Sequence, residues 1–138
     1  MRDKLVKLAL NWQNKFGVAP SITSAISEYD AAMLVGMTVN QYSKSMINRT
    51  AVSPGSDFEF NGILYQVKAN RPSGKKGSRV TKVPKARNYN WDKLIWILYN
   101  ESYEMLEAWE WDVVKYKKAF ANVKRLSPND YRKGKRLF

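Results

Sequence analysis

The most constraining feature of the sequence is the run at residues 93–99, which is apolar at almost every position. A strand of this kind is covered on both faces, so the chain needs other elements above and below it. Residues 103–111 alternate well enough to predict a further strand, and Asp112 caps a predicted helix at residues 112–120. A length of 138 residues fits one domain with a sizeable core. We therefore expect a single α/β domain.

An Asn-Gly pair at 61–62 predicts a tight β-hairpin over residues 57–68, because Asn-Gly readily adopts the positive φ angles that such a turn needs. With the turn centred on this pair, Asp57 falls opposite Gln66. Lys68 lies two residues further along and therefore on the same face as Gln66. Directly paired side chains lie about 5 Å apart. The hairpin thus brings an acid, an amide and a lysine together.

Apolar residues at helical spacing predict two helices before the hairpin. The first belongs to residues 1–20 and ends near Gly17. The second covers residues 23–35, and Glu28 lies at the border of its buried face. Hydroxyl groups suitable for capping the second helix come from Ser21, Thr23 and Ser24. A polar stretch at residues 38–50 fits no single element, and the Ser-Pro-Gly-Ser segment at residues 53–56 predicts a turn.

The charge balance predicts a polyanionic partner. The chain has 24 Lys or Arg against 12 Asp or Glu, a net charge of +12, and neither Cys nor His. The missing residue types exclude zinc fingers, disulfide scaffolds and catalysis by thiol or imidazole. Any catalysis must therefore use carboxylates, amides, hydroxyls, Lys or Arg. Nucleic acid is the favoured partner, ahead of an anionic membrane surface.

The sequence gives no sign of membrane insertion or secretion. It contains no run of about 18 apolar residues, which a membrane-spanning helix would require. Charged residues interrupt the first seven positions, and no small-residue cleavage site follows them. We therefore expect a cytoplasmic protein with no membrane partner.

Residues 70–90 are rich in Gly, Pro, Ser and cations and predict a long loop. Seven cations without an intervening acid would repel one another strongly unless a polyanion compensates them. We expect them to contact nucleic-acid phosphates, although a flexible, soluble loop is the alternative. These residues are Arg71, Lys75, Lys76, Arg79, Lys82, Lys85 and Arg87.

Residues 121–138 form a basic C-terminal tail, and the sequence leaves two interpretations for its segment at residues 131–136. The tail either contacts nucleic acid or is a disordered, solubilising end. Most Trp side chains lie in strand patterns, which indicates core packing. Tyr89 and Tyr131 lie in basic polar segments and are better candidates for base stacking.

Four residues have the chemistry that phosphodiester hydrolysis needs: a cation site, an activated water and a positive group near the transition state. The Asp57 carboxylate and the Gln66 amide oxygen suit Mg²⁺ or Mn²⁺. Glu28 could complete the metal shell. Lys68 could orient or deprotonate the water and stabilise the added negative charge.

These residues carry a resemblance to a known family. The helical segment 26–32, then Asp57, then the Tyr-Gln-Val-Lys segment at residues 65–68 resemble the PD-(D/E)XK, or restriction-endonuclease-like, nuclease superfamily. The resemblance covers about residues 22–120, the expected core between the N-terminal helix and the basic tail. It implies a mixed four-stranded sheet flanked by helices, and a metal-dependent endonuclease that acts on DNA.

The resemblance also implies a role for each residue. Glu28, Asp57 and Gln66 hold the metal, and Lys68 assists water attack. The sequence departs from the family pattern twice: Pro54 lies three positions before Asp57 instead of directly before it, and Gln66 replaces the commoner acid. Loss of that negative charge should weaken metal affinity.

Two other functions remain alternatives. The same fold and cationic face could bind DNA or RNA without catalysis, in which case Gln66 marks a decayed metal site. The chain could instead be a basic inhibitor or interaction protein that binds an acidic protein. One domain of this size has room for one active site, so double-strand cleavage would require a homodimer or two successive nicks.

Overall fold

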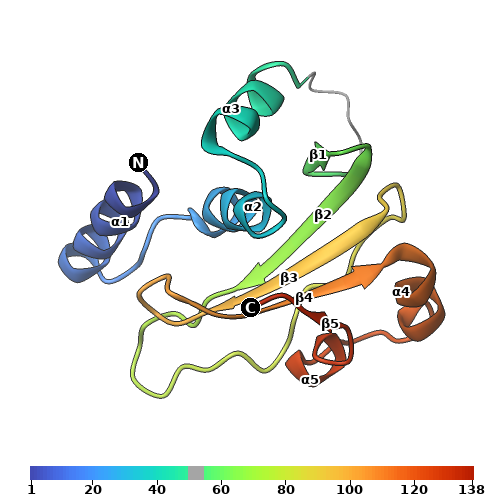
Figure 1. Ribbon diagram of the computed structural model, residues 1–138. Coiled ribbons are helices and arrows are strands. Elements are labelled where there is room, and N and C mark those ends of the chain that lie inside the picture. The colour runs from blue at the N-terminus through green and yellow to red at the C-terminus, as the bar shows by residue number, and fades with distance from the viewer. Residues whose placement is uncertain (50–54) are drawn as a thin grey trace.

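A mixed sheet forms the centre of the structure (Figure 1), a computed structural model that describes residues 1–49 and 55–138. In this described part the sheet has five strands in the order β1-β2-β3-β4-β5. Strands β2 and β3 are parallel, and the other neighbouring pairs are antiparallel. The strands are β1 Phe58–Phe60, β2 Ile63–Asn70, β3 Lys93–Tyr99, β4 Met105–Asp112 and β5 Lys135–Arg136.

The expected α/β class is confirmed, but the expected four strands were wrong, because the described sheet has five. The additional strand, β5, pairs with Trp109 and Glu110 of β4. It is two residues long and lies in the basic tail, where no apolar alternation indicates a strand. Its formation depends on the neighbouring strand rather than on its own sequence.

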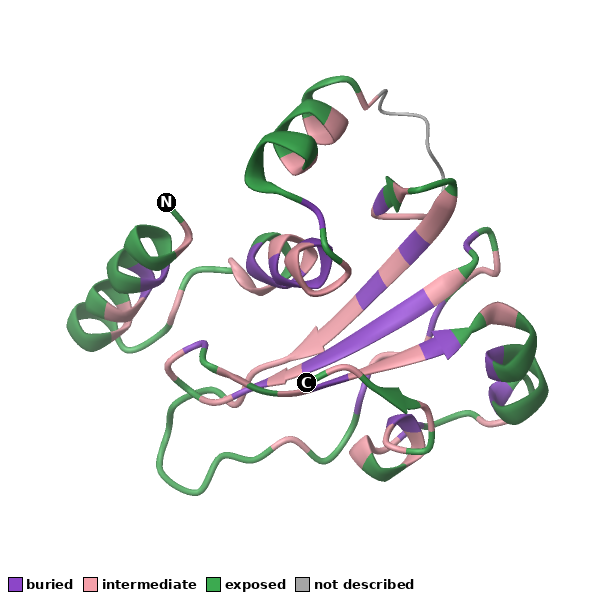
Figure 2. Cartoon of the chain, viewed as in Figure 1, coloured by how far each residue is buried: buried purple, intermediate pink, exposed green. Residues whose placement is uncertain are grey.

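Strand β3 is buried on both faces, as its apolar sequence predicts. Ile95, Ile97 and Tyr99 belong to one hydrophobic core. Leu94 and Trp96 belong to a second core on the opposite face. Figure 2 shows this central strand as almost continuously buried. The sheet therefore separates two helical layers.

Three helices cover the first core: α1 Arg2–Phe16, α2 Thr23–Leu34 and α3 Val39–Ile47. The first two confirm the predicted helices, and Gly17 ends α1 in the left-handed conformation at φ 85°. The expected hydroxyl cap of α2 was wrong. The turn after Pro20 places Ile22 at the N-cap, where no side chain caps the helix. Helix α3 was not predicted, although Thr38 and Gln41 form a capping box at its start.

The second core is covered by α4 Val113–Phe120 and α5 Pro128–Tyr131. The cap at the start of α4 is confirmed, because the Asp112 side chain accepts hydrogen bonds from the backbone of Val114 (2.9 Å) and Lys115 (3.2 Å). Tyr131 is fully buried and stacks against Trp96. A disordered tail and a base-stacking role for Tyr131 are therefore both wrong, because this ring is needed in the core.

The β1–β2 hairpin has the predicted turn and register. Asn61 and Gly62 have φ angles of 52° and 77°. Phe58 pairs with Tyr65, and their rings stack at 4.8 Å in the first core. This register places Asp57 opposite the residue after Tyr65, as predicted. The first half of the predicted turn at residues 53–56, including Pro54, lies within residues 50–54, outside the described residues.

The connection from β2 to β3 is the long loop that the sequence predicts. One isolated β-bridge joins this loop to the segment between α4 and α5. Val83 pairs with Leu126 in an isolated β-bridge. Both side chains are buried in the second core. The loop therefore runs to the sheet face covered by α4 and α5 before it returns to β3.

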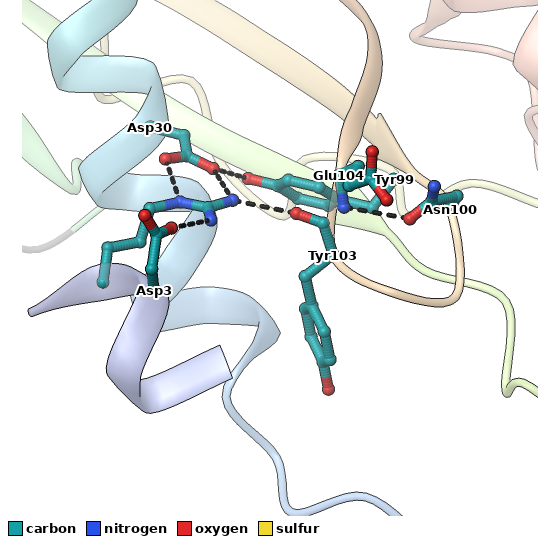
Figure 3. A network of polar contacts seen from close by, with 7 residues as sticks. Asp3, Asp30, Tyr99, Asn100, Tyr103 and Glu104 are labelled. Carbon is teal, nitrogen blue, oxygen red and sulfur yellow. Dashed lines mark hydrogen bonds and ion pairs between the residues drawn. The ribbon is translucent and has the colours of Figure 1, made fainter. Parts of the chain in front are cut away.

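A buried carboxylate joins α1, α2 and β3 (Figure 3). Asp30 of α2 accepts hydrogen bonds from Arg2 of α1 at 2.7 and 2.8 Å, and from the Tyr99 hydroxyl of β3 at 2.6 Å. Arg2 also donates to the Tyr103 carbonyl at 2.9 Å. Each charge of this pair therefore has several partners, which is the condition under which a buried ion pair persists.

No helix within the described ranges is long and apolar enough to cross a membrane.

We predict that Asp30→Ala destabilises the protein by about 3 to 5 kcal/mol, because it leaves the buried Tyr99 hydroxyl without its acceptor and removes both hydrogen bonds that join Arg2 to α2. Urea denaturation measures this change. The matched control is Asp3→Ala, which removes the second carboxylate bonded to Arg2 from a side chain that is 94% exposed. We expect this control to cost less than about 1 kcal/mol. Equal losses in both variants would contradict the importance of the buried carboxylate.

Candidate active site

The short first strand leaves part of β2 uncovered, and the predicted site lies at this edge. Strand β1 pairs with residues 63–65 of β2. Beyond this point, β3 lies on one side of β2, and no described strand lies on the other. Gln66 and Lys68 belong to this uncovered part of β2. Both side chains are partly buried.

Asp57 occupies the space where β1 would otherwise continue. Its Oδ2 atom accepts hydrogen bonds from the backbone N–H of Val67 (2.7 Å) and from Nε2 of Gln66 (2.9 Å). Its own backbone N–H donates to Tyr65 at 2.7 Å. The strand edge therefore fixes the position of the carboxylate, and the predicted contact between Asp57 and Gln66 forms.

Glu28 and Lys68 meet at a cavity of about 250 Å³ beside this edge. Helix α2 supplies Glu28 together with Thr23, Ser24 and Ser27, β2 supplies residues 67–69, and the long loop supplies Pro84. Asp57 and Gln66 do not line this cavity. The four predicted residues thus do not surround a single cavity, and Asp57 is the group that affects the pKa of both Glu28 and Lys68.

Glu28 is in an unfavourable environment for a charge. Burial, followed by repulsion from the Asp57 carboxylate, raises the pKa of Glu28 to about 7, although attraction to Arg49 opposes this shift. In the described part of the chain, no hydrogen bond or ion pair is found for Glu28. Titratable groups with strongly shifted pKa values are typical of functional sites.

Lys68 is also perturbed. Burial lowers its pKa, the Arg87 guanidinium lowers it further, and the Asp57 carboxylate opposes both effects. A lysine of this kind loses its proton more readily than an exposed one. Arg87 was predicted only as one of the loop cations, and its effect on Lys68 depends on the path of the loop, which the sequence does not indicate.

Two residues of the site were missed because they depend on α3. Arg49 follows this helix and donates hydrogen bonds to the carbonyl oxygens of Ser56 and Asp57. Burial, Glu28 and Asp57 raise the pKa of Tyr42 to about 12, so this hydroxyl is protonated at neutral pH. The capping box at the start of α3 could have predicted the helix, but not its contact with the hairpin.

The seven predicted phosphate-binding cations differ in their surroundings. Arg71 bonds to Gln13 and to the Glu101 carbonyl, and it lies over the Tyr103 ring at 4.2 Å. Lys85 donates hydrogen bonds to the backbone carbonyls of residues 121 and 123, which follow α4 in the chain. These two side chains support the fold. The exposed cations are Lys75, Lys76, Arg79, Lys82 and Arg87.

The acid content of the site sets a limit on its metal affinity. Within the described ranges, no group of three or more Asp, Glu, His or Cys side chains is placed to hold a metal ion. The predicted set has only two acids, Glu28 and Asp57, and its third member is the amide Gln66. Such a set binds a divalent cation less strongly than three carboxylates would.

A scan against protein-family models gives no match, and a search of curated proteins finds no significant relative.

We predict that Glu28→Gln is more stable than the wild type at pH 8, in the presence of a chelator, by about 2 kcal/mol. The folded state holds the Glu28 proton up to about pH 7, whereas the unfolded state releases it near the ordinary glutamate pKa of 4.5. The wild type therefore loses stability as the pH rises through this window, and Gln removes that loss. The difference should shrink as the pH falls towards 5.

Denaturation of both proteins across this pH range provides the measurement. Glu59→Gln is the matched control, because it removes an exposed carboxylate from β1 of the same hairpin. A constant difference between wild type and Glu28→Gln at every pH would show that Glu28 does not titrate in this window.

Proposed function

We propose that this protein is a divalent-metal-dependent DNA endonuclease of the PD-(D/E)XK type, with a restriction-endonuclease-like core at residues 22–120. The observation that carries the proposal is the convergence of an α2 acid with a hairpin acid, an amide and a lysine at one uncovered strand edge. The helix, hairpin and parallel-strand order support the fold assignment.

The donor set fits a hard divalent cation. Glu28 and Asp57 repel each other, and a cation between them would relieve that repulsion. Asp57 uses Oδ2 for its hydrogen bonds, which leaves Oδ1 as a metal ligand, and Gln66 donates through Nε2, which leaves Oε1. These three residues would hold Mg²⁺ or Mn²⁺. The bound ion would neutralise the scissile phosphate and activate a water molecule.

Lys68 and Arg87 supply the remaining catalytic functions in this proposal. The lowered pKa of Lys68 suits it to orient the attacking water and to take its proton. Arg87 lies close enough to affect Lys68, and its planar guanidinium can donate several hydrogen bonds to a phosphate. It is therefore suited to stabilise the negative charge that develops on the phosphate.

The exposed loop cations are the proposed contacts to the DNA backbone. Lys75, Lys76, Arg79, Lys82 and Arg87 take part in none of the ion pairs found in the described residues. Phosphates would compensate their mutual repulsion and release counterions on binding. Binding should therefore weaken steeply as the salt concentration rises.

A second candidate function has its own support. The described residues contain no cluster of three acidic, His or Cys ligands, so the fold could bind nucleic acid without cutting it. This alternative predicts salt-sensitive binding that is indifferent to Mg²⁺.

We predict that the purified protein nicks supercoiled plasmid DNA with Mg²⁺ or Mn²⁺ but not with chelator. Asp57→Ala and Lys68→Ala should each reduce the cleavage rate by at least about 100-fold, because they remove a metal ligand and the group that positions the water. Gel electrophoresis of time courses measures the rates.

Glu59→Ala and Lys118→Ala are the controls, since each removes an exposed charge outside the site. Both should retain cleavage. All variants should still shift DNA in a low-salt gel. Full cleavage by Asp57→Ala would refute the proposed site. A salt-sensitive shift without cleavage by the wild type would instead favour the non-catalytic binding module.

We also predict that about 10 mM Mg²⁺ or Mn²⁺ raises the melting temperature of the wild type, because an ion bound to the folded state stabilises it. The shift should disappear in Asp57→Asn, which keeps the side-chain shape but removes the charge. Differential scanning fluorimetry at pH 8 measures both proteins. An equal shift in both would place the ion elsewhere.

A further inference from the structure

Helix α1 has an apolar stripe that the rest of the described chain does not cover. Leu5, Leu8, Trp12 and Phe16 are 39%, 67%, 55% and 57% exposed. The inner side of the same helix is attached through Val6 and Ala9, which are buried, and most of the helix is exposed in Figure 2. Contiguous exposed apolar surface of this kind marks an interaction site.

The two ends of the stripe differ: one carries an exposed aromatic pair, and the other borders a groove. Near the C-terminal end of α1, the Trp12 and Phe16 rings contact each other at 4.6 Å and form an exposed aromatic pair. Near its N-terminal end, Leu5 lines a groove of about 460 Å³ between α1, α2 and α3. Tyr29 and Val39 line the groove from the other two helices.

We propose that a second copy of this chain covers the stripe, with the two α1 helices packed antiparallel about a two-fold axis. If the axis passes between Leu8 and Trp12, each Leu8 faces the Trp12 of the partner. Each Phe16 then lies next to Leu5 of the partner copy, at the entrance of that copy's groove. A two-fold interface requires such self-complementarity, because every contact occurs twice. The spacings of three and four residues match a helix-packing seam.

The available area is what a stable dimer needs. From their exposed fractions, the four stripe residues offer about 450 Å² of surface per copy. A standard interface buries about 800 Å² per partner, of which slightly more than half is apolar. The stripe therefore provides the apolar share, and the groove rim and the outer surface of α1 provide the remainder.

The positive charge beside the stripe distinguishes a second copy of the chain from an acidic protein or an anionic membrane. Lys4 and Lys15 flank the stripe, and the one acid of α1, Asp3, is bonded to Arg2. Two copies would bring these lysines near each other at the rim, so salt should strengthen the dimer by screening them. An acidic protein or an anionic membrane would bind less strongly at high salt. A flat membrane would also leave the groove unfilled.

This inference does not rest on the proposed nuclease function: Tyr42 of the candidate site lines the groove, but none of the four residues proposed for catalysis belongs to the stripe or lines the groove. The proposed interface and the proposed nuclease function can therefore be refuted independently. A dimer without cleavage would refute only the enzyme, and a monomer that cleaves DNA would refute only the interface.

Sedimentation velocity of the wild type at about 5 to 500 µM tests the proposal. We expect a concentration-dependent species of twice the 16.0 kDa chain mass, with a Kd that falls between about 0.1 and 0.5 M NaCl. Trp12→Glu and Leu8→Lys should each raise the Kd at least 10-fold, or about 1.4 kcal/mol. Thermal melts check that both variants fold.

Val114→Glu is the matched control, because Val114 is 71% exposed on α4, away from the stripe. It should change the Kd less than about twofold. A wild type that stays monomeric at every concentration would overturn the proposal, as would a dimer unaffected by both stripe variants. A monomer that floats with phosphatidylglycerol vesicles would overturn it too and would assign the stripe to a membrane surface.

Discussion

The buried carboxylate of Asp30 is the interaction on which the arrangement of the helical layer depends. Helix α1 buries too little apolar surface to be held by packing alone, and its first turn is fixed through Arg2. The Tyr99 hydroxyl fixes the same carboxylate to β3. Because Glu28 lies two residues before Asp30 on α2, the network that positions α2 on the sheet also positions Glu28 at the cavity that Lys68 lines. The stability of the helical layer and the position of Glu28 thus both depend on the turn of α2 that contains Glu28 and Asp30.

The second constraint is the short β1 strand. A longer strand would cover the edge of β2 with backbone hydrogen bonds and leave no space for a site. Here β1 begins only at Phe58, and the side chain of the preceding residue, Asp57, accepts the hydrogen bond from Val67 that a longer strand would have accepted. The edge is therefore protected from edge-to-edge association in part by a charged side chain. The same carboxylate faces Gln66 and affects the pKa of both Glu28 and Lys68.

Local signals predicted much of this arrangement. The register of Asp57, Gln66 and Lys68 followed from one Asn-Gly turn, because a tight turn fixes every pair in a hairpin. The contact between Asp57 and Gln66 in the structure agrees with that register. What could not be predicted depends on tertiary contacts: the pairing of β5, and the internal hydrogen bonds that occupy Arg71 and Lys85. A cation in a basic loop has the same sequence pattern whether it binds phosphate or a carbonyl oxygen of its own chain.

The two acids of α2 show why the site is separable from the structural core. Asp30 is 8% exposed, yet Arg2 and Tyr99 satisfy its charge, so its burial holds the helices together. Glu28 is less buried but has no such partner among the described residues, and its pKa is raised to about 7. Placing an unpaired acid near Asp57 costs folding free energy at neutral pH. The fold therefore satisfies the Asp30 carboxylate fully, whereas Glu28, without a hydrogen-bond partner among the described residues, is the acid that we propose as a metal ligand.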